Sequence, residues 1–327
     1  MYSGSFFCAH KAHTSVLLNE RRMRKMNNAL AFEPYTFEDG LKLKLQERYP
    51  ESNIVFQNVQ KNNGVMLRAI TIVNPDSNIS PTIYLNDFKK QYEETHDIDE
   101  ICNKIAELNE KHEAVEFDVD SVVNFSKVKT RICAKLISRE RNRNLLKTVP
   151  YHEFLDLAVV YFVSLEEMDF ASILIHDNLL ERWGVTEEEL YSCAMENMPK
   201  LFPECFLPMT QVLRGMIADE FVDDENLAEI DDVIYVATNK KKVFGAAVML
   251  YPNFLEHVRE TIGSDFYIIP SSIHEILIIP ETKSGLDKEE LLETVQTVNS
   301  TQVSNEEILA DNVYYYDSES KKIEALF

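Results

Sequence analysis

A short polar segment between two apolar runs contains the residue types that hydrolytic chemistry uses. In FYIIPSSIHEILIIP, residues 266–280, this segment holds Ser271, Ser272, His274 and Glu275. A serine nucleophile needs an imidazole within hydrogen-bond reach and a third group that orients the imidazole. In an extended chain, the side chains of Ser272 and His274 lie roughly 6 to 7 Å apart, which is too far for a direct hydrogen bond.

No glycine stands beside either serine to form the oxyanion hole of a GxSxG turn. The segment is better explained as a turn with capping hydroxyls and a half-exposed histidine. Ser271, Ser272, His274 and Glu275 therefore remain the candidates for an alternative catalytic site, and the favoured interpretation has no catalytic residues.

A second group of potential ligands comprises His112, Glu113, Glu116, Asp118 and Asp120. It has neither the HExxH spacing of zinc enzymes nor the glycine and spacing of a calcium loop. We interpret it as the solvated end of a helix and predict no metal site. The chain has only eight glycines and no GxGxxG or GxxxxGK segment, so we predict no cofactor either.

Two basic clusters could hold phosphate groups. Arg139, Arg141 and Arg143 alternate in SRERNRN, and Lys240, Lys241 and Lys242 follow one another. Aromatic residues that would stack on bases are not interleaved with either cluster. We interpret both clusters as surface charge.

The composition is that of an acidic globular protein. Its 327 residues are 45% hydrophobic, enough for a sizeable core, and 55 acidic against 33 basic residues give a net charge of −22. This charge argues against direct binding to nucleic acid or to an anionic membrane. The five cysteines are odd in number and form no CxxC pair, which favours reduced thiols and a cytoplasmic location.

The first 25 residues differ from the rest of the chain. They carry five basic residues against one acidic residue, so the remaining chain has a charge of −26. One interpretation of residues 1–25 is a disordered basic tail. The other is a mis-assigned start, with Met23 or Met26 as the native first residue, because purine-rich codons for Glu20, Arg21 and Arg22 would resemble a bacterial ribosome-binding site.

Residues 26–149 predict an N-terminal α+β part. Thr36 and Asp39 form a capping pair before a helix that Pro50 ends. Two β-rich runs flank Asn63-Gly64, which is typical of a hairpin turn. We expect one further helix with Asn86 as its cap. We expect another that Asp97 and Glu100 cap.

Residues 150–327 predict a C-terminal α+β part. LDLAVVYF and ASILI form a hairpin, Asp177 and Thr186 open helices, and the acidic stretch 217–232 is a connection. Two successive strand-hairpin-helix units follow. The first pairs VIYVA with VFGAAVMLY, and its helix ends at Gly263; the second pairs FYIIP with HEILIIP, and its helix buries Leu291, Val295 and Val298. The expected fold is α+β, with mostly antiparallel sheets built from β-hairpins and amphipathic helices on one face.

Several stretches carry a family resemblance: NISPTIYLNDF at 78–88, the segment 244–280, the ATNKKKVFGA turn and VNSTQV at 298–303. The chain resembles DUF5688, a family of uncharacterised bacterial proteins found in gut-dwelling clostridia, from about Phe37 to its end. The resemblance implies a cytosolic bacterial protein and supplies no catalytic residues.

Three functions remain open. The favoured one is a non-catalytic binding or regulatory protein with a protein partner as one possibility, because no arrangement of residues predicts a reaction. The second is a serine hydrolase-like enzyme that uses the Pro-Ser-Ser-x-His turn. The third is an acidic mimic that binds a basic, nucleic-acid-binding partner through its negative charge.

Overall fold

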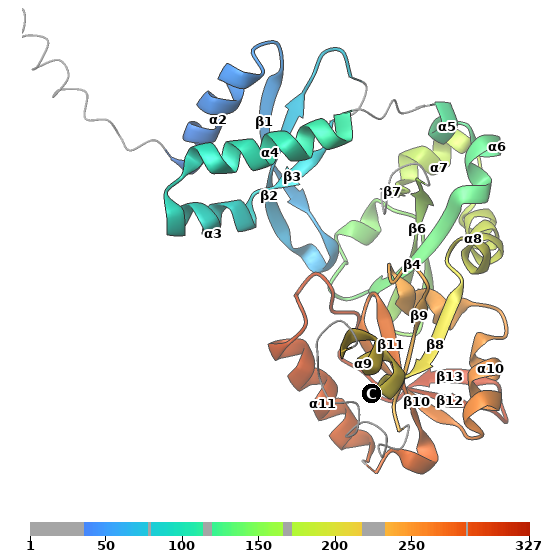
Figure 1. The fold of residues 1–327 in the computed structure, drawn as a ribbon. Coiled ribbons are helices and arrows are strands. Elements are labelled where there is room, and N and C mark those ends of the chain that lie inside the picture. The colour runs from blue at the N-terminus through green and yellow to red at the C-terminus, as the bar shows by residue number, and fades with distance from the viewer. Residues whose placement is uncertain (1–35, 78–79, 114–119, 166–171, 218–232, 286) are drawn as a thin grey trace, which may run out of the picture. The chain divides into compact units, whose positions relative to one another are not determined.

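The computed structural model describes residues 36–77, 80–113, 120–165, 172–217, 233–285 and 287–327, which form an α+β fold (Figure 1). The predicted tail 1–25 and the acidic residues 218–232 lie outside the described residues. Contacts divide the chain into two compact units. One comprises Met1–Gln57 and Arg68–Glu116, and the other comprises Asn58–Leu67 and Phe117–Phe327. The boundary expected between residues 149 and 150 stays a prediction.

The first unit packs helices against one face of a small sheet. The sheet has the order β1-β2-β3, with β1 at Asn53–Gln60, β2 at Met66–Val73 and β3 at Thr82–Tyr84. The helices are α2 (Phe37–Arg48), α3 (Asn86–Thr95) and α4 (Ile98–Glu113). Leu41, Ile70 and Ile101 form part of their shared apolar core.

Helix starts in this unit follow the expected chemistry with one exception. The Thr36 hydroxyl and the Asp39 carboxylate form the predicted capping box of α2, and the Glu100 N–H donates to Asp97 Oδ1 at 2.9 Å before α4. The prediction of Asn86 as the cap of α3 is wrong by one residue. Leu85 holds that position without a side-chain cap bond, and Asn86 is the first helical residue.

The predicted turn at Asn63-Gly64 is confirmed, and it belongs to the second unit. A single 3₁₀ turn, η1 (Asn62–Gly64), joins β1 to β2, and the Lys61 N–H donates to the Val65 carbonyl at 2.7 Å. Asn63 has φ 57° and Gly64 has φ 71°. Asparagine and glycine are the residues that tolerate this left-handed region best.

The second unit contains a sheet built around one fully buried strand, β6 (Leu157–Ser164). It pairs antiparallel with β4 (Ile132–Ser138), with β5 (Tyr151–Phe154) and with β7 (Ser172–Leu174), which confirms the expected pairing of LDLAVVYF with ASILI. Short helical segments surround this sheet: α5 (Asp120–Val123), α6 (Phe125–Val128), η2 (Lys129–Arg131), η3 (Leu145–Lys147) and α7 (Asp177–Trp183).

Helix α8 (Glu187–Leu201) covers one face of this sheet. Thr186 caps it with the expected capping box, whereas Asp177 is the first residue of α7 and His176 holds the cap position. The buried Asn197 donates its amide to the carbonyls of Lys129 and Ile132, which fixes α8 to the start of β4.

The other sheet of this unit has the strand order β13-β12-β10-β11-β9-β8, and its neighbouring strands are antiparallel. Its strands are β8 (Glu204–Pro208), β9 (Tyr235–Asn239), β10 (Phe266–Ser272), β11 (Glu275–Pro280), β12 (Tyr314–Asp317) and β13 (Lys322–Ala325). Helical elements described along this part of the chain include α9 (Met209–Ile217), α10 (Phe254–Ile262), η6 (Glu281–Lys283) and α11 (Lys288–Thr301). One apolar core joins both sheets of the unit.

The second predicted strand-hairpin-helix unit is present, but the first is wrong in one strand. VFGAAVMLY forms a buried 3₁₀ segment, η5 (Gly245–Leu250), instead of a strand. Strands β8 and β11 occupy the two edges of β9, so no edge remains for a further strand. The helix that follows, α10, ends at Gly263 as expected.

The predicted buried face of α11 is also partly wrong. Leu291 and Val295 are buried, but Val298 is 39% exposed and Asn299 takes its place in the core. Residues 291, 295 and 299 follow one another at a spacing of four, which keeps them on the same side of a helix. None of the helices in the described residues combines the length and the apolar character that crossing a bilayer requires.

Candidate functional site

The turn between β10 and β11 contains the sequence-predicted candidates. Ser272 pairs with Glu275 across the hairpin, and Ser272 Oγ accepts the His274 main-chain N–H at 3.0 Å. Ser271 and Ser272 are the last residues of β10, and Glu275 is the first residue of β11. The Ser272 hydroxyl therefore stabilises the turn locally, as the sequence interpretation expects.

The imidazole of His274 contacts Phe244 and Glu307. Its Nδ1 accepts the Phe244 N–H at 3.2 Å, and its Nε2 lies 3.8 Å from Glu307 Oε1. Because Nδ1 is an acceptor, a neutral ring carries its proton on Nε2, toward Glu307. In the described part of the chain, no hydrogen bond joins the hydroxyl of Ser271 or Ser272 to this ring. The structure thus brings His274 to Phe244 and Glu307.

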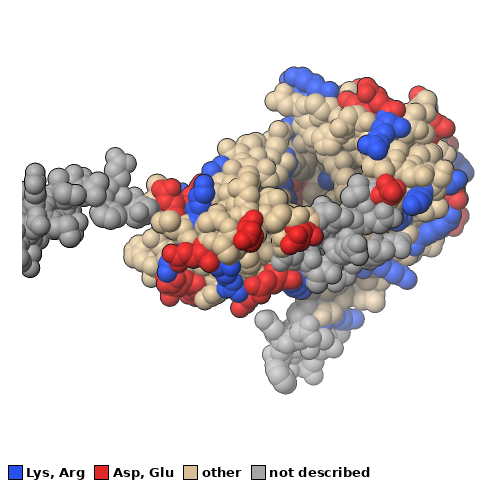
Figure 2. Space-filling view, turned by 90° about the horizontal axis from the view of Figure 1, so that it is seen from above, with Lys and Arg blue, Asp and Glu red and all other residues tan. Residues whose placement is uncertain are grey.

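The three arginines of the first basic cluster each have an acidic partner. Arg139 pairs with Glu153 at 3.0 Å, Arg141 with Asp311 at 2.5 Å and Arg143 with Glu140 at 3.2 Å. Among the described residues, no group of three His, Cys, Asp or Glu could hold a metal ion, and Glu116 and Asp118 of the predicted cluster lie outside this part. On the face in Figure 2, basic side chains are interspersed with acidic ones.

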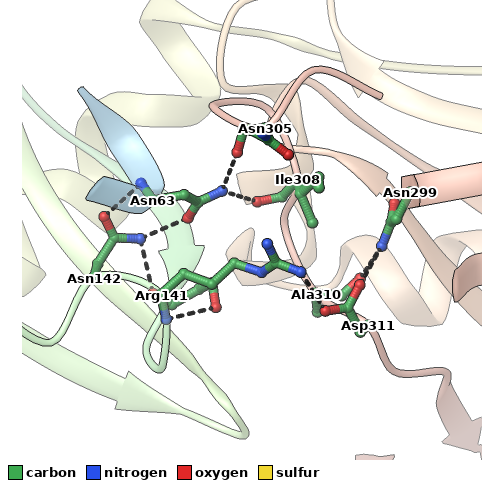
Figure 3. A network of polar contacts seen from close by, with 9 residues as sticks. Asn63, Arg141, Asn142, Asn299, Asn305, Ile308, Ala310 and Asp311 are labelled. Carbon is green, nitrogen blue, oxygen red and sulfur yellow. Dashed lines mark hydrogen bonds and ion pairs between the residues drawn. The ribbon is translucent and has the colours of Figure 1, made fainter. Parts of the chain in front are cut away.

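A pair of asparagines connects the η1 turn to the loop after β4 (Figure 3). The Asn63 main-chain N–H donates to Asn142 Oδ1, and Asn142 Nδ2 donates to Asn63 Oδ1, both at 2.8 Å. Asn142 Nδ2 also donates to the Ser138 carbonyl at 2.9 Å. Asn142 is 1% exposed, so these bonds replace the water that its amide would otherwise need.

The same turn also binds the loop that follows α11. Asn63 Nδ2 donates to the carbonyls of Asn305 and Ile308, at 2.8 and 2.7 Å. Asn62 Nδ2 donates to the Glu306 carbonyl at 2.8 Å. Segments near residues 63, 142 and 306 are therefore fixed to one another, although they are far apart in the sequence (Figure 3).

A charged branch continues from this network along α11. Arg141 binds Asp311 Oδ2, and the buried Asn299 donates to Asp311 Oδ1 and to the Ala310 carbonyl, each at 2.8 Å (Figure 3). Partial burial of Asp311 opposes its ionisation, but the bonds from Arg141 and Asn299 outweigh burial and lower the pKa of this carboxyl. Asp311 is thus held as an anion.

A pocket of about 390 Å³ opens beside this branch. Its charged lining consists of Glu140, Arg141, Asp156 and Asp311, and its apolar lining includes Leu292 and Phe327. The volume lies in the range of small-molecule sites, which are typically about 300 to 1,000 Å³. Three carboxylates against one guanidinium make the pocket acidic.

Asp156 reaches the pocket from the tight turn between β5 and β6. Phe154 and Leu157 pair on either side of this turn, and Leu155 adopts φ 55°. A left-handed conformation is unfavourable for a bulky residue, and such strain often accompanies functional sites. Asp156 Oδ1 accepts the Tyr314 hydroxyl at 2.7 Å, and Asp156 Oδ2 accepts Asn312 Nδ2 at 3.4 Å. Burial and the nearby carboxylate raise the pKa of Tyr314, so its hydroxyl stays a donor.

Local sequence patterns do not indicate most of this site. The spacing around Arg141 indicates only surface charge, and the pattern at Asn63 indicates only a turn. The signal that could have found the site is the polar run Asp311-Asn312 between apolar residues, together with the helical position of Asn299. Their convergence with Asp156 depends on contacts between distant segments, which no local pattern contains.

The fold and the pocket together define an acidic α+β protein with antiparallel sheets and a small-molecule-sized pocket in its second unit. A sequence model of DUF5688, a family of unknown function, matches residues 35–318, and the chain belongs to this family. No curated protein and no solved structure matched the chain.

Proposed function

We propose that this chain is a non-catalytic binding protein and that the pocket beside α11 holds a small organic amine. The observation that carries the proposal is the position of Asp156. Its carboxylate lines the pocket and is held by two neutral donors, the Tyr314 hydroxyl and the Asn312 amide. No Lys or Arg pairs with Asp156 in the described part of the chain.

The remaining charges of the pocket support a cationic ligand. Arg141 is bound to Asp311, so its guanidinium is already balanced by a carboxylate. Among the described residues, Glu140 pairs with the exposed Arg143, and an exposed ion pair of this kind stabilises a protein very little. An ammonium group in the pocket would therefore meet a net negative lining, with Asp156 as its principal partner.

The apolar lining suits the carbon chain of such a ligand. Leu292 and Ala310 come from α11 and the loop after it, and Phe327 is 53% exposed. Burying methylene groups against these side chains would add roughly 0.8 kcal/mol per group. A short aliphatic amine or diamine combines both features.

Binding without reaction is favoured by the chemistry of the lining. Ser138 Oγ accepts the Arg141 N–H at 3.3 Å, and the other polar groups are carboxylates, amides and the paired guanidinium. A nucleophile hydrogen-bonded to a base does not occur among these described groups. The four cysteines of the described residues are thiols, which supports a cytosolic setting for the binding protein.

The test compares thermal stability with and without a short diamine, 1,4-diaminobutane, at pH 7.5 and constant ionic strength. We expect the diamine to raise the melting temperature of the wild type and of Glu293→Gln, which removes a charge from α11 outside the pocket. Asp156→Asn keeps the size of the side chain and should lose the effect. Equal stabilisation of Asp156→Asn, or equal stabilisation of the wild type by a dicarboxylate of the same length, would overturn the proposal.

A further inference from the structure

Lys135 is an unusual residue for its position in β4. The strand reads ICAKLIS, and every other residue in it is buried. Lys135 is half-buried and pairs with Val160 of β6, so these two side chains lie on the same face of the sheet. Its Nζ lies 4.4 Å from the centroid of the Phe244 ring.

The described neighbours of Lys135 are mainly apolar. Val160 clusters with Ile137, Val149 and Ala158, and η5 follows Phe244. The positive charge of Lys61, beside η1, acts on Lys135. Within the described residues, no carboxylate forms an ion pair with Lys135.

Behind Phe244 lies the histidine of the β10/β11 turn. The Phe244 and His274 rings stack with centroids 5.8 Å apart, and the Phe244 N–H donates to His274 Nδ1. The other nitrogen of the His274 ring, Nε2, lies 3.8 Å from Glu307 Oε1. These contacts fix the aromatic ring on which the Lys135 amine rests.

Such an environment disfavours the ammonium form. Burial, followed by the charge of Lys61, lowers the pKa of Lys135 from 10.5 to about 8. That change increases the unprotonated fraction at pH 7 by roughly 300-fold. Lysines that are desolvated or stand next to another cation are the ones that act as nucleophiles toward carbonyl compounds.

We propose that Lys135 is a covalent binding site for a small aldehyde, which its amine takes up as an imine. The Nζ lone pair adds to the carbonyl carbon, and the carbonyl oxygen then leaves as water with the two amine protons, so that a C=N bond remains. Hydrolysis reverses the step, and neither direction needs an oxidant or a reductant. The half-buried position beside Phe244 and Val160 suits a short apolar aldehyde. This site is separate from the pocket at Asp156 and does not depend on its ligand.

The experiment treats the full chain with propionaldehyde and sodium cyanoborohydride, which reduces the imine to a stable secondary amine, and follows each lysine by peptide mass mapping. Lys241 is the internal control, because its Nζ also lies over a phenyl ring, that of Phe202 at 4.6 Å, but the residue is exposed. At pH 7 we expect Lys135 to be modified at least tenfold faster than Lys241. A rate at Lys135 equal to or below that at Lys241 would overturn the proposal.

A variant tests the cause of the reactivity. Lys61→Gln removes the second positive charge and should slow the modification of Lys135 by about three- to tenfold at pH 7. At pH 9.5 the difference between wild type and variant should nearly vanish, because most of the Lys135 amine is then unprotonated in both proteins. A Lys135 rate that is independent of pH between 6 and 9 would contradict the proposal, and so would an unchanged rate in a folded Lys61→Gln variant.

Discussion

Asn63 and Asn142 form a reciprocal pair: the main chain and amide of Asn63 bind both polar atoms of the Asn142 side chain, with two bonds of 2.8 Å. The pair joins the turn between β1 and β2 to the loop after β4. Each residue also binds a second partner, so that the Asn63 amide reaches the loop after α11 and the Asn142 amide reaches Ser138. Three segments, the η1 turn, the loop after β4 and the loop after α11, thus depend on two amide side chains.

We expect Asn142→Ala to reduce the free energy of unfolding by about 2 to 4 kcal/mol, because it removes three hydrogen bonds and leaves the half-buried N–H of Asn63 without its acceptor. Urea denaturation measures this loss. The matched control is Asn144→Ala in the same loop, whose side chain accepts a bond from the exposed Lys147 and should cost less than about 1 kcal/mol. Similar losses in the two variants would contradict the central role of the pair.

The backbone at Gly245 lies so close to Thr238 and His274 that a side chain would not fit there. A Cβ atom there would lie 2.0 Å from Thr238 Oγ1 and 2.3 Å from the His274 carbonyl oxygen. Thr238 Oγ1 donates to that carbonyl at 2.7 Å, so neither atom can move without breaking a bond inside the sheet. Gly245→Ala should therefore destabilise the protein by about 2 kcal/mol or more.

Gly215→Ala is the control for this variant. Gly215 lies in α9, and a Cβ added there meets no atom within 4 Å. Alanine is favoured over glycine in a helix by about 1 kcal/mol, so the melting temperature should stay unchanged or rise. Equal melting temperatures of Gly245→Ala and Gly215→Ala would show that the close approach at Gly245 does not limit the stability of the protein.

Local patterns predict most elements of this fold but not where distant polar residues meet. The capping box at Thr36, the Asn63-Gly64 turn and the β10/β11 hairpin are encoded by residues within a few positions of one another, and all three are confirmed. The apolar run VFGAAVMLY was predicted as a strand because its composition suits one. It forms η5 instead, since the edges of β9 are already occupied, which is a property of the whole sheet.

The candidate site was less predictable for the same reason. Ser272 and His274 were selected because they are close in sequence, and the bond between them is indeed local. The ring of His274, however, contacts Phe244 and Glu307, which are distant in the sequence. Asp156 and Asp311 meet at the pocket from positions 155 residues apart. The polar run Asp311-Asn312 is a local signal, but it does not indicate that Asp156 lies beside it. Lys135 has a clearer signal, because a single charged residue within ICAKLIS is costly to bury without a partner.

Acid stability should depend on Asp311. Its folded-state pKa is lowered, because the bonds from Arg141 and Asn299 outweigh partial burial. A carboxyl with a lowered pKa stabilises the fold above its unfolded pKa, here 3.8, and this contribution is lost as the pH falls through the lower folded value. Asp311→Asn should thus be less stable than the wild type at pH 6, and the difference should shrink below pH 4.

Urea titrations from pH 7 to pH 2.5 would follow this difference. Glu293→Gln serves again as the control, since its carboxylate has no hydrogen bond or ion pair among the described contacts. A difference between wild type and Asp311→Asn that stays constant down to pH 2.5 would show that the ionised carboxylate does not contribute.

The turn at Ser272 allows the hydrolase alternative to be tested directly. Ser272 Oγ accepts a single main-chain bond from His274, so Ser272→Ala should cost at most about 1 kcal/mol. Ser264→Ala is the matched control, because it also loses one bond between a serine hydroxyl and the main chain. We expect similar small losses in urea denaturation.

Because His274 Nδ1 already accepts the Phe244 N–H, neither Ser271 nor Ser272 should be activated, and a fluorophosphonate probe should add no mass at either residue. Stoichiometric labelling of one of these serines that disappears in His274→Ala would establish a nucleophile and overturn the assignment of this segment as a structural turn.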